Sequence, residues 1–231
     1  MPITPATSRL LAACRFGLDA HLVEARSALD AGADIEHRHP GDGSTPLIFA
    51  MQARKIDLAL LLIERGADLF AADDHGDDVL RWPAWRADLP TLALMLRAAA
   101  PDPTRFDLDR AFLAACESPD PDPLVVACLR ALIAAGASID ARGDRACFPL
   151  GLAASRGGAE RASFLVESGA DPLAVDGRRM DAITVARLRP AGRDPELEAY
   201  LNRAALAVSE ARQLGLALAD TASAEPRRGA L

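Results

Sequence analysis

Residues 45–68 read TPLIFAMQARKIDLALLLIERGAD, and this stretch holds every landmark of a repeating unit. Thr45 can cap a helix, and Pro46 suits the first helical position because the N–H there has no intrahelical partner. After a short turn, a second and more apolar helix is expected over residues 56–65, and Gly66 suits the left-handed end of that helix. The stretch therefore predicts a helix, a turn, a second helix and a polar loop.

The Gly-Ala-Asp that closes this stretch recurs along the chain. It stands at residues 32–34, 66–68 and 169–171, with a near copy at Gly136-Ala137-Ser138 and Ala100-Pro101-Asp102 in the intervening slot. The steps between these motifs are 34, 34, 36 and 33 residues. A period of this size indicates a stacked array, in which each unit buries its apolar face on its neighbours. Such arrays mostly bind other macromolecules, so the pattern indicates a class of function and leaves the partner open.

The starts of the first helices recur in the same frame. They are expected near Ser8, Thr45, Asp78, Asp109, Phe148 and Asp181. Alanine stands five positions later in five of these six units, and a small residue there lets adjacent helix pairs approach closely. The third unit carries Pro83 instead. Its first helix therefore either starts late, near Pro83, or is broken, and its register stays open.

These landmarks resemble the ankyrin-repeat family. The resemblance rests on Thr45-Pro46-Leu47-x-x-Ala50, Pro149-Leu150-x-x-Ala153 and the Gly-Ala-Asp endings, and it covers residues 6–205. It implies an all-α solenoid of about six helix-turn-helix units with hairpin loops. It also implies protein recognition through the loop tips and the concave face of the first helices. The family's His after Thr-Pro-Leu is missing in every unit, so we expect part of an inter-repeat hydrogen-bond network to be lost.

The C-terminal part of the chain predicts one long helix. Asp194-Pro195-Glu196 is a strong helix start, and apolar residues follow at alternating steps of four and three to about Ala219. We expect the array to occupy residues 1–205, the helix to extend over 206–220, and 221–231 to form a flexible tail.

Composition excludes several classes of function. A net charge of −7 and a pI near 5.1 argue against nucleic-acid binding. No secretory signal and no apolar run long enough for a membrane span are present, so a cytoplasmic protein is expected. Four widely spaced cysteines predict reduced thiols rather than a zinc site or disulfides. Because no catalytic or phosphate-binding motif is found, we expect no enzyme activity, no metal and no cofactor.

The candidate binding residues come from positions that the resemblance places on the concave face. When the helix start is counted as position one, the fifth and eighth positions include Phe49, Gln52, Trp82, Trp85, Leu113 and Cys116. Aromatic side chains in the middle of a groove are typical of interface anchors, because they remove a large area from water at a low cost in side-chain entropy. The alternative is that the two tryptophans fill space left by the irregular helix at Pro83.

Charged candidates lie beside these positions. The ninth position carries Arg86, Glu117 and Arg156, which predict either an alternating charged row at an interface or a solvated row. The second loop tip is acidic and includes Asp73, Asp74 and His75, whereas the later tips carry Arg142, Arg145, Arg178 and Arg179. Such a gradient would orient a partner of complementary charge. Loop tips lack the fixed geometry that a metal requires, so a metal site is not expected.

The sequence thus predicts a non-catalytic module that binds a protein partner. A narrower hypothesis is a bacterial immunity protein that neutralises a cognate toxin or effector. A third is a scaffold that self-associates through the C-terminal helix, although a monomer is favoured because alanines and Gly215 weaken that seam.

Overall fold

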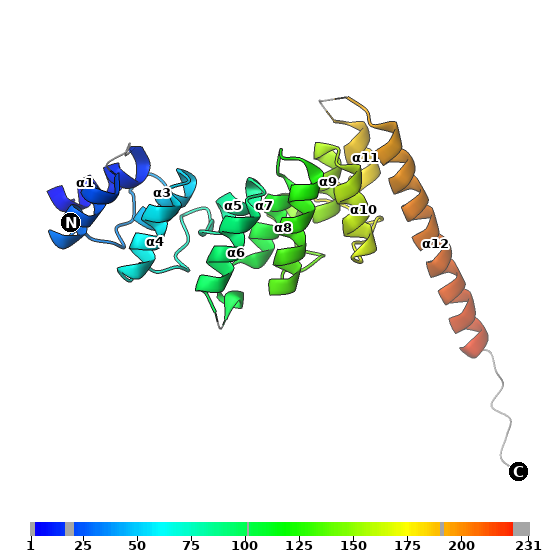
Figure 1. Cartoon of the computed structure of the whole chain (residues 1–231). Coiled ribbons are helices and arrows are strands. Elements are labelled where there is room, and N and C mark those ends of the chain that lie inside the picture. Colours follow the sequence, from blue (N-terminus) through cyan, green and yellow to red (C-terminus); the bar gives the residue numbers. More distant parts are fainter. Residues whose placement is uncertain (1–2, 17–20, 101, 190–191, 224–231) are drawn as a thin grey trace, which may run out of the picture. The chain divides into compact units, whose positions relative to one another are not determined.

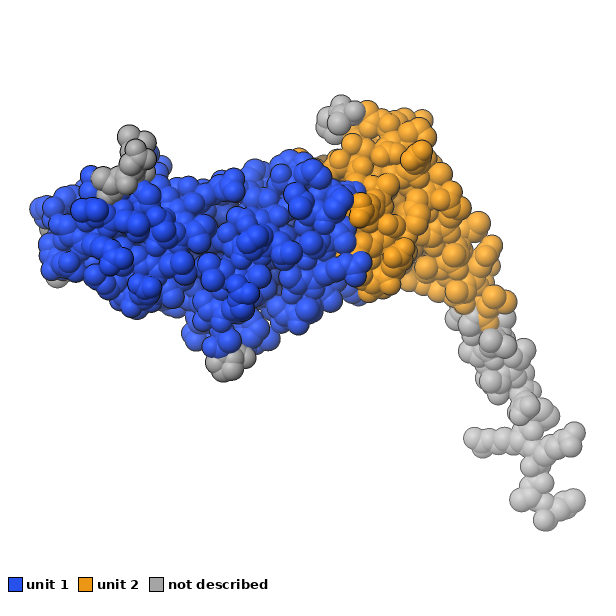
Figure 2. Space-filling view, viewed as in Figure 1, with its two compact units in different colours: residues 1–141 blue, residues 142–231 orange. Residues whose placement is uncertain are grey.

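The computed structural model describes residues 3–16, 21–100, 102–189 and 192–223, with side chains to residue 214. These residues form twelve α-helices and two short 3-10 turns, and their one β-bridge is isolated. The chain divides into two compact units, unit 1 over residues 1–141 and unit 2 over residues 142–231 (Figure 2). Each is described by itself.

Unit 1 contains four helix pairs. Its helices are α1 (Pro5–Phe16), α2 (His21–Asp30), α3 (Pro46–Gln52), α4 (Ile56–Glu64), α5 (Arg81–Trp85), α6 (Leu89–Ala98), α7 (Leu108–Cys116) and α8 (Asp122–Ala135), with a 3-10 turn at Pro103–Arg105. Each odd-numbered helix packs on the even-numbered helix that follows it, and α1, α3, α5 and α7 pack on one another in that order (Figure 1). This confirms an all-α fold of stacked helix pairs.

The core of unit 1 lies between the layers of this stack. Fully buried side chains include Leu47, Ile48, Leu58, Leu62 and Phe112. In α4, the second helix of its pair, Leu58, Ala59, Leu61 and Leu62 are buried, as expected for a helix that has neighbours on several sides.

Unit 2 contains two further pairs. Its helices are α9 (Pro149–Arg156), α10 (Ala159–Glu167), α11 (Ala182–Arg187) and α12 (Pro195–Ser223), preceded by a 3-10 turn at Asp144–Ala146. Helix α9 packs on α10 and α11, and α12 packs on both α10 and α11. Helix α12 therefore takes the place of a second helix in the last pair.

Helix α12 begins where the sequence predicts. The Asp194 carboxylate accepts the backbone N–H of Leu197 at 3.0 Å, and Leu197 and Leu201 are fully buried. Side chains over residues 206–214 are exposed or half-exposed. The helix continues to Ser223, so residues 221–223 are helical rather than part of the expected tail. Residues 224–231 lie outside the described part of the chain.

Two helices start earlier than expected. Helix α1 begins at Pro5, and the Thr4 hydroxyl accepts the N–H of Thr7 at 3.2 Å, which repeats the Thr-Pro start of α3. Helix α7 begins at Leu108, and the Asp107 carboxylate accepts the N–H of Arg110 at 2.9 Å. The predicted starts at Ser8 and Asp109 are therefore displaced by local caps nearer the N-terminus.

The third repeat has a first helix of five residues, Arg81–Trp85. Pro83 lies in the first turn of this helix, where its missing N–H breaks no intrahelical hydrogen bond. Upstream, the buried Asp78 carboxylate accepts the N–H of Leu80 at 2.8 Å. Of the two alternatives, the helix therefore starts late and is not broken.

Side chains tie several loop ends to an adjacent segment. The hydroxyl of Thr7 accepts the N–H of Asp34 at 2.9 Å, and Asp109 accepts the N–H of Ser138 at 2.7 Å. Both N–H groups belong to the third position of a Gly-Ala-Asp motif or its near copy. Both hydrogen bonds lie within one repeat and join the start of its first helix to the loop after its second helix. A hydrogen bond between repeats also exists despite the missing family histidine, because the Asp78 carboxylate accepts the N–H of Asp107 at 3.2 Å.

Candidate interaction surface

The two tryptophans of the chain lie together at the centre of unit 1. Trp82 and Trp85 contact each other edge to face, with ring centroids 6.3 Å apart, and both are half-buried. They belong to the five-residue helix α5, which packs between α3 and α7. Offset edge-to-face contacts of this kind stabilise aromatic pairs beyond the area that they bury.

Arg86 holds this pair in place. Its guanidinium lies 5.5 Å from the Trp82 ring centroid and 6.0 Å from that of Trp85. It also donates a hydrogen bond of 3.1 Å to the backbone carbonyl of Gln52 at the end of α3. Burial lowers the pKa of Arg86, and the nearby positive charge of Arg54 lowers it further. We call Gln52, Trp82, Trp85 and Arg86 the tryptophan cluster.

The hydrogen bond of Arg86 belongs to a recurring arrangement. Lys55 donates to the carbonyl of Ala13 at 2.7 Å, and Arg189 in unit 2 donates to the carbonyl of Arg156 at 3.1 Å. In each case a basic side chain of one repeat binds a carbonyl near the end of the first helix of the preceding repeat. Carbonyls at helix C-termini lack intrahelical donors, so these contacts satisfy them.

Three of the predicted groove residues lie in the core. Phe49, Leu113 and Cys116 are 3%, 8% and 0% exposed. Phe49 is covered by His39, which meets it edge to face at 5.4 Å, and by the Arg15 guanidinium at 5.4 Å from the ring centroid. The apolar centre was expected from Phe49, Leu113 and the two tryptophans, but only the tryptophans are half-exposed, because neighbouring side chains cover positions that the helix frame alone leaves open. A partner-binding role of these positions stays a prediction.

The residues of the predicted charged row are divided between the two units. Arg86 and Glu117 are half-buried, and no ion pair joins these two residues, both of which the structure describes. Arg156 lies in unit 2, at the end of α9, and is exposed. A role of this row in an interface stays a prediction.

The acidic loop tip is largely used within the fold. The Asp73 carboxylate is 9% exposed and accepts the N–H groups of His75 and Asp77, at 2.8 and 2.9 Å. Asp74 is exposed and pairs with Arg38 at 3.2 Å. Asp73 thus stabilises the turn, and a partner-binding role of this tip stays a prediction. His75 stays exposed.

Of the four cysteines, three are buried and one is half-exposed. Burial raises the pKa of both the Cys14 and the Cys128 thiol to about 12, and Cys116 is fully buried. Cys147 is half-exposed. Since the thiolate is the reactive form, we expect an uncharged alkylating reagent to modify Cys147 in the folded chain and all four thiols after unfolding. Mass spectrometry counts the modified sites, and rapid modification of Cys14 in the folded chain would contradict the described packing.

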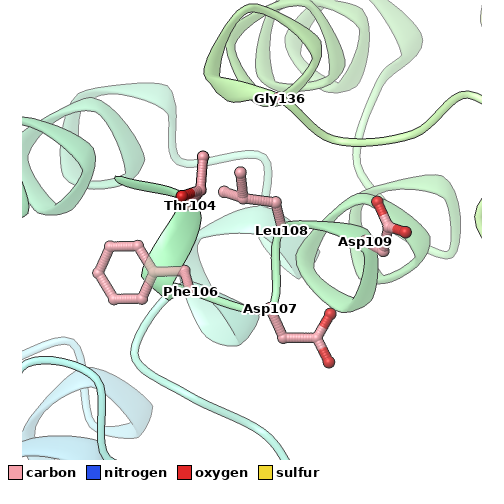
Figure 3. Close-up of a pocket in the computed structure, with 6 residues that line it drawn as sticks. All are labelled: Thr104, Phe106, Asp107, Leu108, Asp109 and Gly136. Atoms are coloured by element: carbon pink, nitrogen blue, oxygen red, sulfur yellow. The ribbon is translucent and has the colours of Figure 1, made fainter. Parts of the chain in front are cut away.

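A polar hollow of about 260 Å³ opens beside the start of α7. Figure 3 shows its lining, which is Thr104, Phe106, Asp107, Leu108, Asp109 and Gly136. The carboxylates of Asp107 and Asp109 already accept backbone N–H groups, from Arg110 and Ser138. This hollow therefore lies between the start of α7 and the end of α8, and its two carboxylates already serve a helix cap and a loop end.

Unit 2 contains a smaller hollow of about 140 Å³ with a mostly apolar lining. It lies between α9, α11 and two hairpin tips, and Phe148, Gly151, Leu152, Met180 and Val185 contribute to it. One signal for it is present in the sequence, because Phe148 stands at a helix start where the other five units carry capping residues. We did not predict this hollow.

These features define the class of the protein, a helical repeat protein whose side chains form a preorganised surface cluster. No described helix combines the length and hydropathy needed to cross a bilayer.

Comparisons with known proteins agree with this class. The family model "Ankyrin repeat" matches residues 42–74, the region of the stretch that decides the fold. The crystal structure of an ankyrin repeat domain from Acinetobacter baumannii is similar at a TM-score of 0.62, with 26% sequence identity over 85% of this chain and 97% of that one. The chain matches no curated protein.

Residues 42–74 of the chain match the ankyrin-repeat family, and the fold of the chain is similar to that of an ankyrin repeat domain. Ankyrin repeats are generally protein–protein interaction modules, and the fold is typically non-catalytic.

Proposed function

We propose that this chain captures a protein partner on the tryptophan cluster. The observation that carries the proposal is the packing of two half-buried indoles against each other and against Arg86, which is itself anchored to the Gln52 carbonyl at 3.1 Å. Tryptophan and arginine are the side chains most enriched among those that dominate binding energy at interfaces.

The geometry favours binding over simple filling of space. Rings and guanidinium that are already held in place lose little conformational entropy when a partner docks. In addition, the Trp82 indole N–H is buried and has no hydrogen-bond partner in the described structure. An unsatisfied donor of this kind costs about 1–3 kcal/mol, which a phenylalanine filling the same space would avoid.

The proposal is tested by capture with the immobilised full chain from a lysate of the organism that encodes it. We expect a protein retained by the natural chain to bind Trp85→Ala at least about tenfold more weakly, because truncating a central anchor typically costs more than 1.4 kcal/mol. Quantitative mass spectrometry of the retained protein, followed by titration of the purified partner, measures the change.

Val23→Ala is the matched control for this experiment. Val23 lies on α2 and is 71% exposed, so its truncation removes an apolar side chain outside the cluster. Circular dichroism of both variants checks that the helices are intact. A partner that binds Trp85→Ala and Val23→Ala equally well would contradict the assignment of the cluster.

The narrower role of an immunity protein is a proposal that the identity of the captured partner tests. If that partner is a toxin, the natural chain is expected to suppress its activity at equimolar concentration, and Trp85→Ala is expected to suppress it less. A captured toxin that stays fully active in the complex would remove this role.

A second candidate is self-association through α12. Leu206 and Leu214 are 60% and 66% exposed there, and a helix without packing partners is marginally stable in water. Because capture by the cluster requires no second copy, we expect light scattering to give the monomer mass of 24.4 kDa. A dimer mass that is lost in a chain truncated after residue 205 would instead favour self-association.

A further inference from the structure

We infer that the apolar hollow of unit 2 is a docking site for an acidic peptide segment that carries one aliphatic anchor residue. This site is separate from the tryptophan cluster and does not rest on the function proposed for it. The argument uses only residues of unit 2.

The hollow has the size and lining for one aliphatic side chain. Its volume is about 140 Å³, and Leu152, Met180 and Val185 are half-buried residues of its wall. Gly151 belongs to the wall as well, and a Cβ atom there would stand 2.8 Å from the Phe148 ring. The Phe148 ring can pack there only because Gly151 has no side chain. An aliphatic side chain that enters gains contact with apolar groups that are now partly in water.

Arginines lie on the two hairpin tips that form part of the wall. The hairpin tips that contribute Cys147, Asp176 and Met180 to the wall also carry Arg142, Arg145, Arg178 and Arg179. The tips are held side by side, because Gly177 donates its N–H to the carbonyl of Arg145 at 2.8 Å. The Arg142 guanidinium lies 5.3 Å from the Phe148 ring centroid and donates to the carbonyl of Val175 at 3.2 Å.

These charges are available to a ligand. Arg145, Arg178 and Arg179 are exposed, and in the described part of the chain none of the three has a carboxylate within 4.0 Å. The Asp176 carboxylate, by contrast, accepts the N–H groups of Arg178 and Met180, at 2.7 and 2.9 Å. The tips therefore present a positive rim on a chain whose net charge is −7.

An acidic peptide fits this combination better than a nucleic acid does. Bases bind by stacking on exposed aromatic faces, whereas the accessible wall is aliphatic and Phe148 is 3% exposed. Carboxylates that flank an aliphatic anchor match both the rim and the hollow.

Cys147 provides the readout, because it lines the hollow and is the one cysteine that is not buried. The full chain is treated with iodoacetamide, and the rate of Cys147 alkylation is followed by mass spectrometry. The probe is the capped peptide Asp-Glu-Leu-Asp-Glu, and its matched control is Asp-Glu-Ala-Asp-Glu. We expect the leucine peptide to slow alkylation at concentrations at least about tenfold lower than the alanine peptide.

Charge reversal tests the rim. Arg178→Glu combined with Arg179→Glu is expected to weaken protection at least about tenfold. Arg9→Glu combined with Arg26→Glu, on exposed residues of unit 1, is expected to leave protection unchanged. Because all four arginines are exposed, both double variants should fold, and circular dichroism checks this.

Four results would overturn the inference. They are no protection at about 1 mM leucine peptide, equal protection by both peptides, unchanged protection in the Arg178/Arg179 variant, and equal protection by oligothymidylate. None of them bears on the tryptophan cluster, and a failure of partner capture there would leave this site intact.

Discussion

Replacing Phe112 with alanine is expected to lower the free energy of unfolding by about 3–5 kcal/mol. Phe112 lies in α7 and is fully buried. Helix α7 packs on both α5 and α8. Truncation leaves a cavity between repeats, and the stability of a repeat array depends on these interfaces between neighbours. Since whole domains are stable by only about 5–15 kcal/mol, the loss is a large share.

Urea denaturation followed by circular dichroism measures this loss. Phe16→Ala is the matched control, because Phe16 is 70% exposed and its truncation is expected to change stability by less than about 0.5 kcal/mol. A Phe112→Ala chain as stable as the natural one would mean that the repeats do not share the described core.

The natural chain is also expected to gain stability from Asp78 as the pH falls from neutral to about 4. Burial raises the pKa of Asp78 to about 6, although two backbone N–H groups bind the carboxylate, and the charges of Asp107 and Asp77 raise it further. Between about pH 6 and the ordinary value of 3.8, the folded chain binds a proton at Asp78 that the unfolded chain does not. Protonation of Asp78 therefore adds about 3 kcal/mol to the free energy of unfolding over this interval, and this gain is absent above pH 6.

Asp78→Asn isolates this contribution. The natural chain is expected to gain about 3 kcal/mol relative to the variant between pH 7 and pH 4 in urea denaturation. For Asp42 the opposite dependence on pH is expected, so the natural chain should lose stability relative to Asp42→Asn as the pH falls. Burial would raise the pKa of Asp42, but hydrogen bonds from Ser44 and His39 lower it overall. Its contribution is present above the ordinary pKa and is lost as the pH falls through the lowered value. Parallel profiles for the natural chain and Asp78→Asn would contradict the buried site.

The repeat frame was predictable because it depends on local chemistry. Thr45 and Asp181 cap their helices through N–H groups three residues ahead, and Gly66 adopts a positive φ of 90° at the end of its repeat. Each of these preferences is a property of a few adjacent residues. The earlier start of α1 was not predicted because Thr4 and Ser8 are both capable of capping a helix and lie only four residues apart. The spacing of the other repeats favoured Ser8.

The surface was less predictable than the frame. The helix position of Phe49 matches that of Trp82, yet Phe49 is covered by Arg15, from the preceding repeat, and by His39, from the loop before α3. Trp82 and Trp85 stay half-buried in a helix of only five residues. Accessibility therefore depends on contacts between repeats and on the length of each helix, which a count from the helix start does not contain.

Acrylamide quenching of tryptophan fluorescence tests the central claim most directly. The chain has two tryptophans, and both belong to the cluster, so their emission reports on this surface alone. When a captured partner that lacks tryptophan saturates the chain, we predict that quenching falls and the emission shifts to shorter wavelength, because docking removes both rings from water. Unchanged quenching and emission at full saturation would show that the partner binds elsewhere and would contradict the account.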